Sequence, residues 1–160
     1  MRLCLSSRWL CATLLAFTLS TGFAQTLQPA TTVPLLAGQN TPVGEVTCGF
    51  EDGSKLNGRC IANTTNGWCM QLVHVYAGSV APSSMAPGSF PFQYRPSQCA
   101  TSVSVPFTLP RACSGPAAVL AFHAEVINRN KAGFETAWAQ GSPTGSNWSM
   151  VFAVACPFDL

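Results

Sequence analysis

Charge is scarce in this chain of 160 residues: eight are basic, six are acidic, and charged residues make up 9% of the sequence. The few lysines and arginines form no basic cluster. Because nucleic acid and anionic membrane surfaces are recognised through such clusters, we expect neither as a partner. Beyond residue 24 the sequence also lacks an apolar run of about 20 residues, the length of a membrane-spanning helix, so we expect no membrane span.

Motifs of redox, metal and hydrolytic chemistry are missing as well. The cysteines form no C-x-x-C pair, the two histidines belong to no H-E-x-x-H motif, and no serine lies in a nucleophile elbow. A metal site built from His74, His123 and Glu125 would have suitable ligand types but lacks the tight spacing of a zinc motif. We therefore expect no metal and no cofactor.

The first 24 residues have the pattern of a cleavable signal peptide. A basic start precedes an apolar run from Trp9 to Leu19, and Gly22 and Ala24 supply the small residues that signal peptidase requires. Cleavage after Ala24 would remove two of the eight basic residues and leave a net charge of zero. We expect a secreted, extracellular protein, or a periplasmic or cell-surface protein if the source is bacterial.

Cysteine usage agrees with export. Two of the eight cysteines lie in the leader, and the even number that follows it predicts three disulfides. The sequence does not choose among the connectivities. Cys48 with Cys60 is a local candidate because turn signals lie between them, and Cys99 with Cys113 is another if the chain between them folds back. The disulfide cysteines are Cys48, Cys60, Cys69, Cys99, Cys113 and Cys156.

Alternation of apolar and polar residues dominates the chain after the leader. It is clearest in residues 68–76, where it places Trp68, Met70 and His74 on one face of a strand. Residues 117–128 favour a strand over a helix because of their Val, Ile and Phe content. About seven short strands separated by Gly, Pro and Asn turns predict an all-β fold, an antiparallel two-sheet sandwich stabilised by disulfides.

The chain divides into three segments. Residues 1–24 are the leader, residues 25–41 are rich in Thr, Pro and Gln and predict a flexible N-terminal segment, and residues 42–160 form a single β-sandwich domain. Asn63 and Asn147 each begin an acceptor sequon for N-glycosylation, which applies if the source glycosylates exported proteins.

Several short motifs occur in a fixed order along residues 35–158. They are Ala37-Gly-Gln39 with Val43-Gly-x-Val46, Gly67-Trp68, His74-x-Tyr76-x-Gly78, Ala86-Pro-Gly-x-Phe-Pro91, His123-Ala-x-Val126, Glu135-Thr-Ala-Trp138-Ala-x-Gly141 and Asn147-Trp-x-Met-x-Phe152. Together they resemble an extracellular β-rich domain of secreted and surface proteins for which no activity is established. The resemblance implies a location and an architecture. This chain departs from the pattern at Leu72, where members tend to have an acidic residue, and has more cysteines than they do.

Two of the expected strands each carry two polar side chains at alternate positions, which therefore share a face. If these strands are neighbours, the four side chains could converge with a carboxylate and a tryptophan from residues 134–139. Aromatic faces stack on sugar rings, while carboxylates and imidazoles bind hydroxyls, so one interpretation of the patch is a carbohydrate or small-ligand site. The alternative is an ordinary solvated sheet face. The candidate residues are His74, Tyr76, His123, Glu125, Glu135 and Trp138.

We favour a non-enzymatic secreted or cell-surface module that binds a carbohydrate or a surface protein, or acts structurally. One alternative is a small secreted hydrolase or ligand-modifying enzyme that uses His123 with Glu125 or Glu135. The two differ in whether these side chains meet in a concave pocket or lie on an exposed face. Another alternative is a secreted inhibitor or effector that binds through the Pro-rich aromatic loop 81–96 and exposes an apolar patch there.

Overall fold

The computed structural model describes residues 26–131, 133–145 and 147–158, and the leader expected at residues 1–24 lies outside them. This part of the chain contains ten strands, a single-turn 3-10 helix and no α-helix. Among the described residues, no helix is both long enough and apolar enough to span a membrane. The elements are β1 (Leu27–Ala37), β2 (Thr41–Glu51), β3 (Asn57–Thr64), β4 (Trp68–Gly78), η1 (Pro87–Ser89), β5 (Phe92–Tyr94), β6 (Ser102–Thr108), β7 (Ala117–Asn128), β8 (Phe134–Ala139), β9 (Ser142–Pro143) and β10 (Met150–Ala155).

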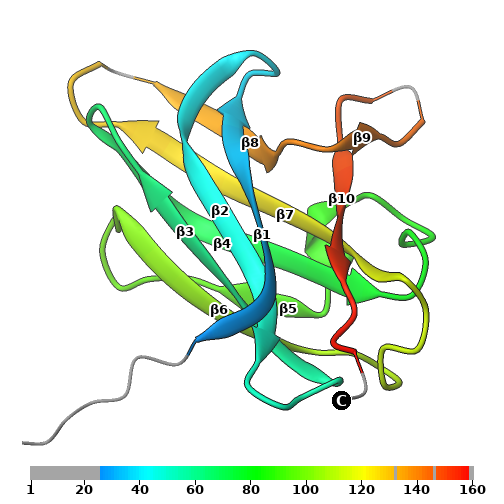
Figure 1. The fold of residues 1–160 in the computed structure, drawn as a ribbon. Helices are drawn as coiled ribbons and strands as arrows, with labels where there is room; N and C mark the ends of the chain where they lie inside the picture. The colour runs from blue at the N-terminus through cyan, green and yellow to red at the C-terminus, as the bar shows by residue number, and fades with distance from the viewer. Residues whose placement is uncertain (1–25, 132, 146, 159–160) are drawn as a thin grey trace, which may run out of the picture.

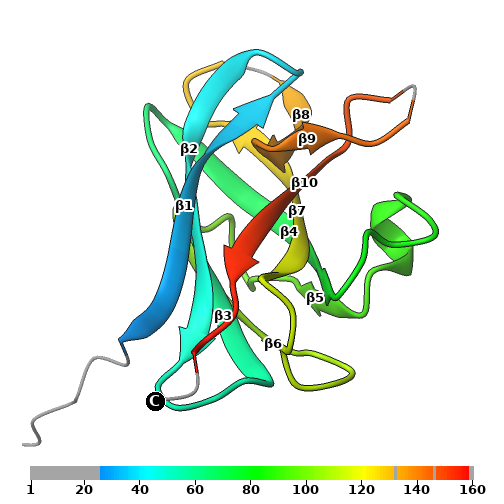
Figure 2. The same ribbon diagram turned by 45° about the vertical axis from the view of Figure 1, so that its right-hand side comes forward.

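The strands form one antiparallel sheet in the order β5-β4-β7-β8-β1-β2-β3-β6, which curls into a nearly closed barrel (Figures 1 and 2). Strand β7 is its branch point. One edge of β7 pairs with β4, while the other is shared, with β10 beside residues 117–120 and β8 beside residues 123–127. The curled sheet closes where Met70 of β4, the strand next to one end of the order, and Ala100, just before β6 at the other end, exchange two backbone hydrogen bonds of 2.7 and 3.0 Å.

The all-β fold is confirmed, but one curled sheet takes the place of the expected two-sheet sandwich of about seven strands. Alternation indicates which side chains face the core, and it is the same along the strands of a sandwich and of a barrel. The difference lies in strand pairing. Because β1 pairs with both β2 and β8, it joins the two halves that a sandwich would keep apart.

Residues 25–41 also differ from expectation, because most of them form β1 instead of a flexible segment. The strand pairs with β2 from Leu27 to Ala37. Although the segment is rich in Thr, Pro and Gln, its alternate residues near the end of the strand are apolar and face the core. Leu35 and Ala37 are buried there, and Val33 packs against it. Of the outward side chains, Gln28, Thr32 and Pro34 are exposed, whereas Leu36 packs against an apolar cluster on the outer face of the sheet.

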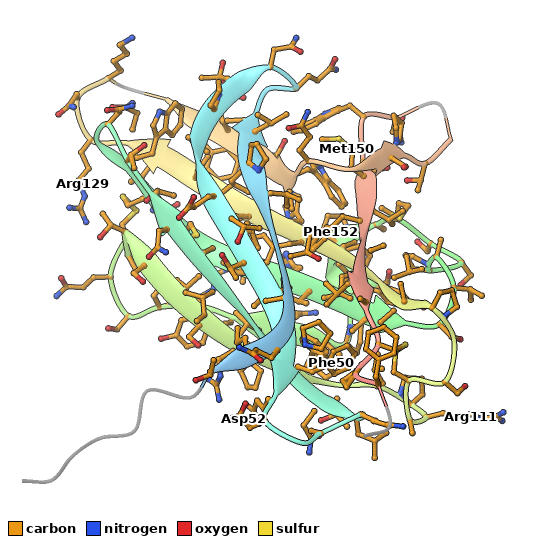
Figure 3. The ribbon with its side chains drawn as sticks, in the orientation of Figure 1. Phe50, Asp52, Arg111, Arg129, Met150 and Phe152 are labelled. Atoms are coloured by element: carbon orange, nitrogen blue, oxygen red, sulfur yellow. A yellow bond between two sulfur atoms is a disulfide. The ribbon has the colours of Figure 1, made fainter. Side chains whose placement is uncertain are left out.

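The main core fills the inside of the barrel with alternate side chains from the surrounding strands (Figure 3). Phe50 and Phe107 pack edge to face there, with ring centroids 6.0 Å apart. Phe122 lies on the inward face of β7 and is fully buried. Burial of one such side chain is worth about 1.5–3 kcal/mol, so these aromatic residues are the largest single contributors to the core.

A β-bulge in β4 decides which of its side chains face outward. The pairing of β4 with β7 shifts between Met70 and Leu72, so Gln71 is the extra residue. Met70 belongs to the inner core, whereas Tyr76 packs on the outer face of the sheet. The prediction that Trp68, Met70 and His74 share one face was therefore wrong, since one additional residue reverses the alternation.

Three disulfides join the described cysteines, as predicted. Cys48 and Cys60 are directly opposite each other on β2 and β3, with their Cα atoms 4.1 Å apart, and this local candidate is confirmed. The candidate pair Cys99 and Cys113 was wrong because the straight strand β6 carries the chain away between them. The other two bonds are Cys69–Cys99 and Cys113–Cys156.

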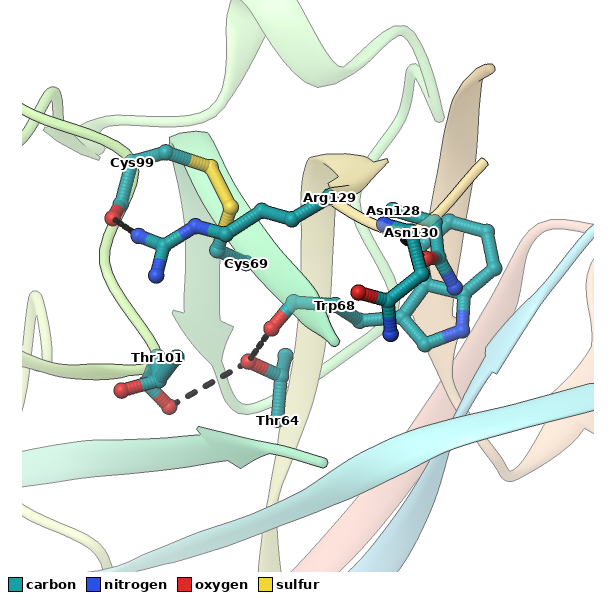
Figure 4. The surroundings of a disulfide bond; sticks show 8 residues. All are labelled: Thr64, Trp68, Cys69, Cys99, Thr101, Asn128, Arg129 and Asn130. Carbon is teal, nitrogen blue, oxygen red and sulfur yellow. Dashed lines mark hydrogen bonds between the residues drawn. A yellow bond between two sulfur atoms is a disulfide. The ribbon is translucent and has the colours of Figure 1, made fainter. Parts of the chain in front are cut away.

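The Cys69–Cys99 disulfide lies beside the backbone bridge that closes the barrel (Figure 4). Polar contacts surround it. The guanidinium of Arg129 donates a hydrogen bond to the carbonyl of Cys99, and the hydroxyl of Thr64 donates one of 2.7 Å to the carbonyl of Trp68. The disulfide and the Met70–Ala100 bridge thus join β4 to the start of β6, and the two side-chain hydrogen bonds tie the neighbouring ends of β3 and β7 to them.

Candidate functional site

A second apolar cluster lies on the outer face of the sheet, over β4, β7 and β8. Phe90 and Trp138 are its largest members, 2% and 5% exposed, with ring centroids 6.1 Å apart in an edge-to-face arrangement. Because this cluster covers β7 from outside while the barrel core covers it from inside, β7 is buried on both faces. A strand buried on both faces has a continuous apolar sequence, which explains why residues 117–128 lack clean alternation.

The loop from residue 79 to 91 supplies one wall of this outer cluster. Figure 2 shows it in green, on the same side of the sheet as the orange connection between β8 and β10. The hydroxyl of Tyr76 donates a hydrogen bond of 2.9 Å to the carbonyl of Val80 and holds the start of the loop. Phe90 anchors its end, with its ring 6.0 Å from that of Tyr76.

Two histidines and a tryptophan form a row across three neighbouring strands beside the cluster. His74 of β4 lies directly opposite His123 of β7, which lies directly opposite Trp138 of β8. The Nδ1 atoms of the two imidazoles are 3.4 Å apart, and the His123 ring packs against Trp138 with centroids 4.9 Å apart. The histidines are only 6% and 5% exposed. The register of the three strands therefore builds this row.

Burial keeps both imidazoles neutral at pH 7. Burial, with a smaller contribution from nearby His74, lowers the pKa of His123 from 6.5 to about 4. Burial also lowers the pKa of His74, against the opposing effect of Glu125, and the charge of Arg95 adds to the lowering. In a neutral imidazole one ring nitrogen donates and the other accepts, so two facing Nδ1 atoms are satisfied when one donates to the other.

Of the two candidate carboxylates, the structure places one on the same face of the sheet as this row and the other on the opposite face. Glu125 follows His123 on the outer face of β7 and is half-buried, opposite Leu72 and Thr136. Glu135, by contrast, is exposed and pairs with Val126, whose side chain faces the barrel core, so it lies on the other face of the sheet. The structure therefore does not bring Glu135 to His123. Glu135 and Trp138 are three residues apart on one strand, which puts them on opposite faces.

An open groove of about 500 Å³ lies beside the row. Its floor includes His123 and Trp138, and Trp148 lies next to Trp138 with ring centroids 6.4 Å apart. The candidate set from sequence missed most of the lining, which comes from two loops. The sequence signals for them were the recurring motifs and, for one loop, the alternative of a binding surface in the Pro-rich segment 81–96. The lining residues are Met85, Ala86, Pro87, His123, Thr136, Trp138, Asn147, Trp148 and Ser149.

Neither a metal centre nor a known family explains this site. Within residues 26–131, 133–145 and 147–158, no group of three or more His, Cys, Asp or Glu side chains is placed to hold a metal ion. The two facing imidazoles therefore lack a third ligand from the described residues, and each is the polar partner of the other. No family model, no curated protein and no solved structure matches this chain.

Proposed function

We propose that this protein is a secreted or cell-surface binding module and that the groove beside Trp138 and Trp148 holds its ligand, a carbohydrate. The observation that carries the proposal is the groove itself, whose volume of about 500 Å³ is that of a small-ligand site and whose lining is aromatic with a few neutral polar groups. The disulfides support export, since such bonds persist in oxidising compartments.

The two tryptophans have different roles in this proposal. Trp138 is 5% exposed and is enclosed by His123, Phe90 and Trp148, so it forms the floor. Trp148 is half-buried and comes from the connection that borders the groove, so it offers an indole face to a ligand. Indole faces stack on the apolar faces of sugar rings, and polar groups around them bind the hydroxyls.

Another hollow of similar volume lacks the combination of aromatic and neutral polar side chains that lines the groove. It has a volume of about 480 Å³ and lies between Gly78 and the loop 109–118, next to Cys113. None of its lining residues is aromatic. It therefore has no surface on which a sugar ring could stack, and the ligand site is assigned to the groove with the tryptophans.

The test is a binding screen of the oxidised protein against neutral glycans, followed by titration of the best binder. Trp148→Ala is expected to weaken binding about tenfold, the effect of losing one aromatic contact of about 1.4 kcal/mol. Tyr94→Ala is the matched control, because Tyr94 is an exposed aromatic residue on β5 that does not line the groove. Equal binding by both variants, or no glycan bound by the wild type, would overturn the proposal.

A further inference from the structure

We propose that His74 and His123 act as one proton-sharing pair, which presents the Nε2 atom of His123 to the groove as either a hydrogen-bond donor or an acceptor. The ligand that fits such a group is an uncharged polyhydroxyl compound. The inference rests on the proposed function of the groove and adds to it a positioning residue, His74, that does not line the groove.

The geometry leaves Nε2 as the only ring nitrogen that His123 can offer to a ligand. Its Nδ1 atom faces that of His74 at 3.4 Å, and the strand register of β4 and β7 fixes the two residues opposite each other. His123 is nevertheless one of the residues that line the groove. An imidazole has two nitrogens, so the one not engaged with His74 is available on the groove side.

Two arrangements of the ring protons satisfy the pair, and both leave it uncharged. In one, His74 donates from Nδ1, the Nδ1 of His123 accepts, and the Nε2 of His123 carries its proton and donates. In the other, His123 donates from Nδ1, and its Nε2 is bare and accepts, while Nε2 of His74 carries the second proton. Each arrangement holds two protons on four nitrogens, so neither gives the pair a net charge.

The electrostatics of the groove select an uncharged ligand. Its lining contains no Asp, Glu, Lys or Arg. The charged groups that act on His74 are Glu125, on the same strand as His123, and Arg95, which follows β5, and they have opposite signs. Fixed charges of opposite sign are what bind anionic and cationic groups most strongly, and this lining has none. Hydroxyl groups both donate and accept, so they match an Nε2 atom that does the same.

The proton arrangement is measured on the ligand-free protein, by long-range ¹H–¹⁵N NMR of the histidine rings at pH 7 in oxidised, ¹⁵N-labelled material. We expect one protonated and one bare Nδ1 atom in the pair, coupled across the hydrogen bond. In His74→Phe, the Nδ1 of His123 loses its partner and this coupling disappears. Protons on both Nε2 atoms of the wild type, with no coupling between the rings, would overturn the proposal while leaving the groove's function untouched.

The other measurement is ligand binding in the presence of EDTA. The probes are neutral methyl glycosides, the anionic sugar glucuronate and the cationic sugar glucosamine. His74→Phe is expected to weaken neutral glycoside binding about three- to tenfold, the value of one neutral hydrogen bond. His74→Asn keeps a polar atom near the position of Nδ1 and is expected to restore it. Unfolding curves of both variants check that they fold. Equal binding by His74→Phe and wild type, stronger binding of the charged sugars, or loss of binding in EDTA would each overturn the proposal.

Discussion

Acidification is expected to destabilise this fold through His123. The imidazole is 5% exposed, and burial, with a smaller effect of His74, lowers its pKa from 6.5 to about 4. In the unfolded chain the ring regains its ordinary pKa, so the unfolded state binds a proton first as the pH falls. The stability that the neutral ring contributes is therefore complete above pH 6.5 and is lost progressively as the pH falls towards 4.

The size of the effect follows from the pKa difference. A tenfold change in the protonation equilibrium is worth about 1.4 kcal/mol, so lowering the pKa of His123 from 6.5 to about 4 corresponds to about 3 kcal/mol. This is a large fraction of the free energy of unfolding of a small domain, about 5–15 kcal/mol. His74 acts in the same direction, because burial and Arg95 lower its pKa and outweigh Glu125.

Urea unfolding with intact disulfides, at pH values from about 7.5 down to 4, measures the effect. The matched variant is His123→Asn, which does not titrate in this range and keeps a polar atom near the position of Nδ1. Carboxylates titrate in both proteins, so the difference between the two pH profiles isolates the imidazole. We expect the wild type to lose about 3 kcal/mol more than the variant. Parallel profiles would refute the assigned role of burial.

Two further predictions concern the barrel. Replacing both Cys69 and Cys99 by Ser is expected to lower the free energy of unfolding by about 3–4 kcal/mol, from the chain entropy of a loop with a sequence separation of 30; denaturant unfolding that shows no loss would contradict it. Gly44→Ala should destabilise by roughly 2–3 kcal/mol, because a methyl group on β2 would overlap the backbone of Asn63 on β3. Gly53→Ala, with a φ of 70° in an open turn, should cost only about 1 kcal/mol, so a comparable melting temperature for the two variants would argue against the overlap.

Alternation in the sequence predicted the strands well because each strand has to place its apolar side chains on the core side. Residues 68–76, where the alternation is clearest, lie in β4 as expected, and residues 117–128, expected as a strand from their Val, Ile and Phe content, form β7. Alternation carries no information on which strands are neighbours, so the closed arrangement and the pairing of Cys69 with Cys99 were not predictable from it. The bulge at Gln71 was also hidden, since an extra residue has no signature beyond the alternation that it interrupts.

The candidate site was predictable in part. His74 and His123 were grouped because each shares a strand face with another polar residue, and the structure brings their imidazoles together. Glu135 was grouped by chemistry alone, and its position on the strand puts it on the opposite face from Trp138. The wall that contains Trp148 comes from the chain between two strands, and loop positions follow from tertiary packing that no local pattern encodes.

Because β8 and β10 share one edge of β7, the segment that forms a wall of the groove is separate from the strands that form the barrel. Because β8 ends at Ala139 and β10 begins beside the other half of β7, the intervening chain has to leave the sheet, and β9 within it pairs only with β10 among the described strands. Substitutions and length changes in this connection would alter one wall of the groove without disturbing the pairing of the barrel strands. If the groove binds the proposed ligand, changes in this connection would give related chains new binding preferences while the disulfide-bonded barrel stays the same.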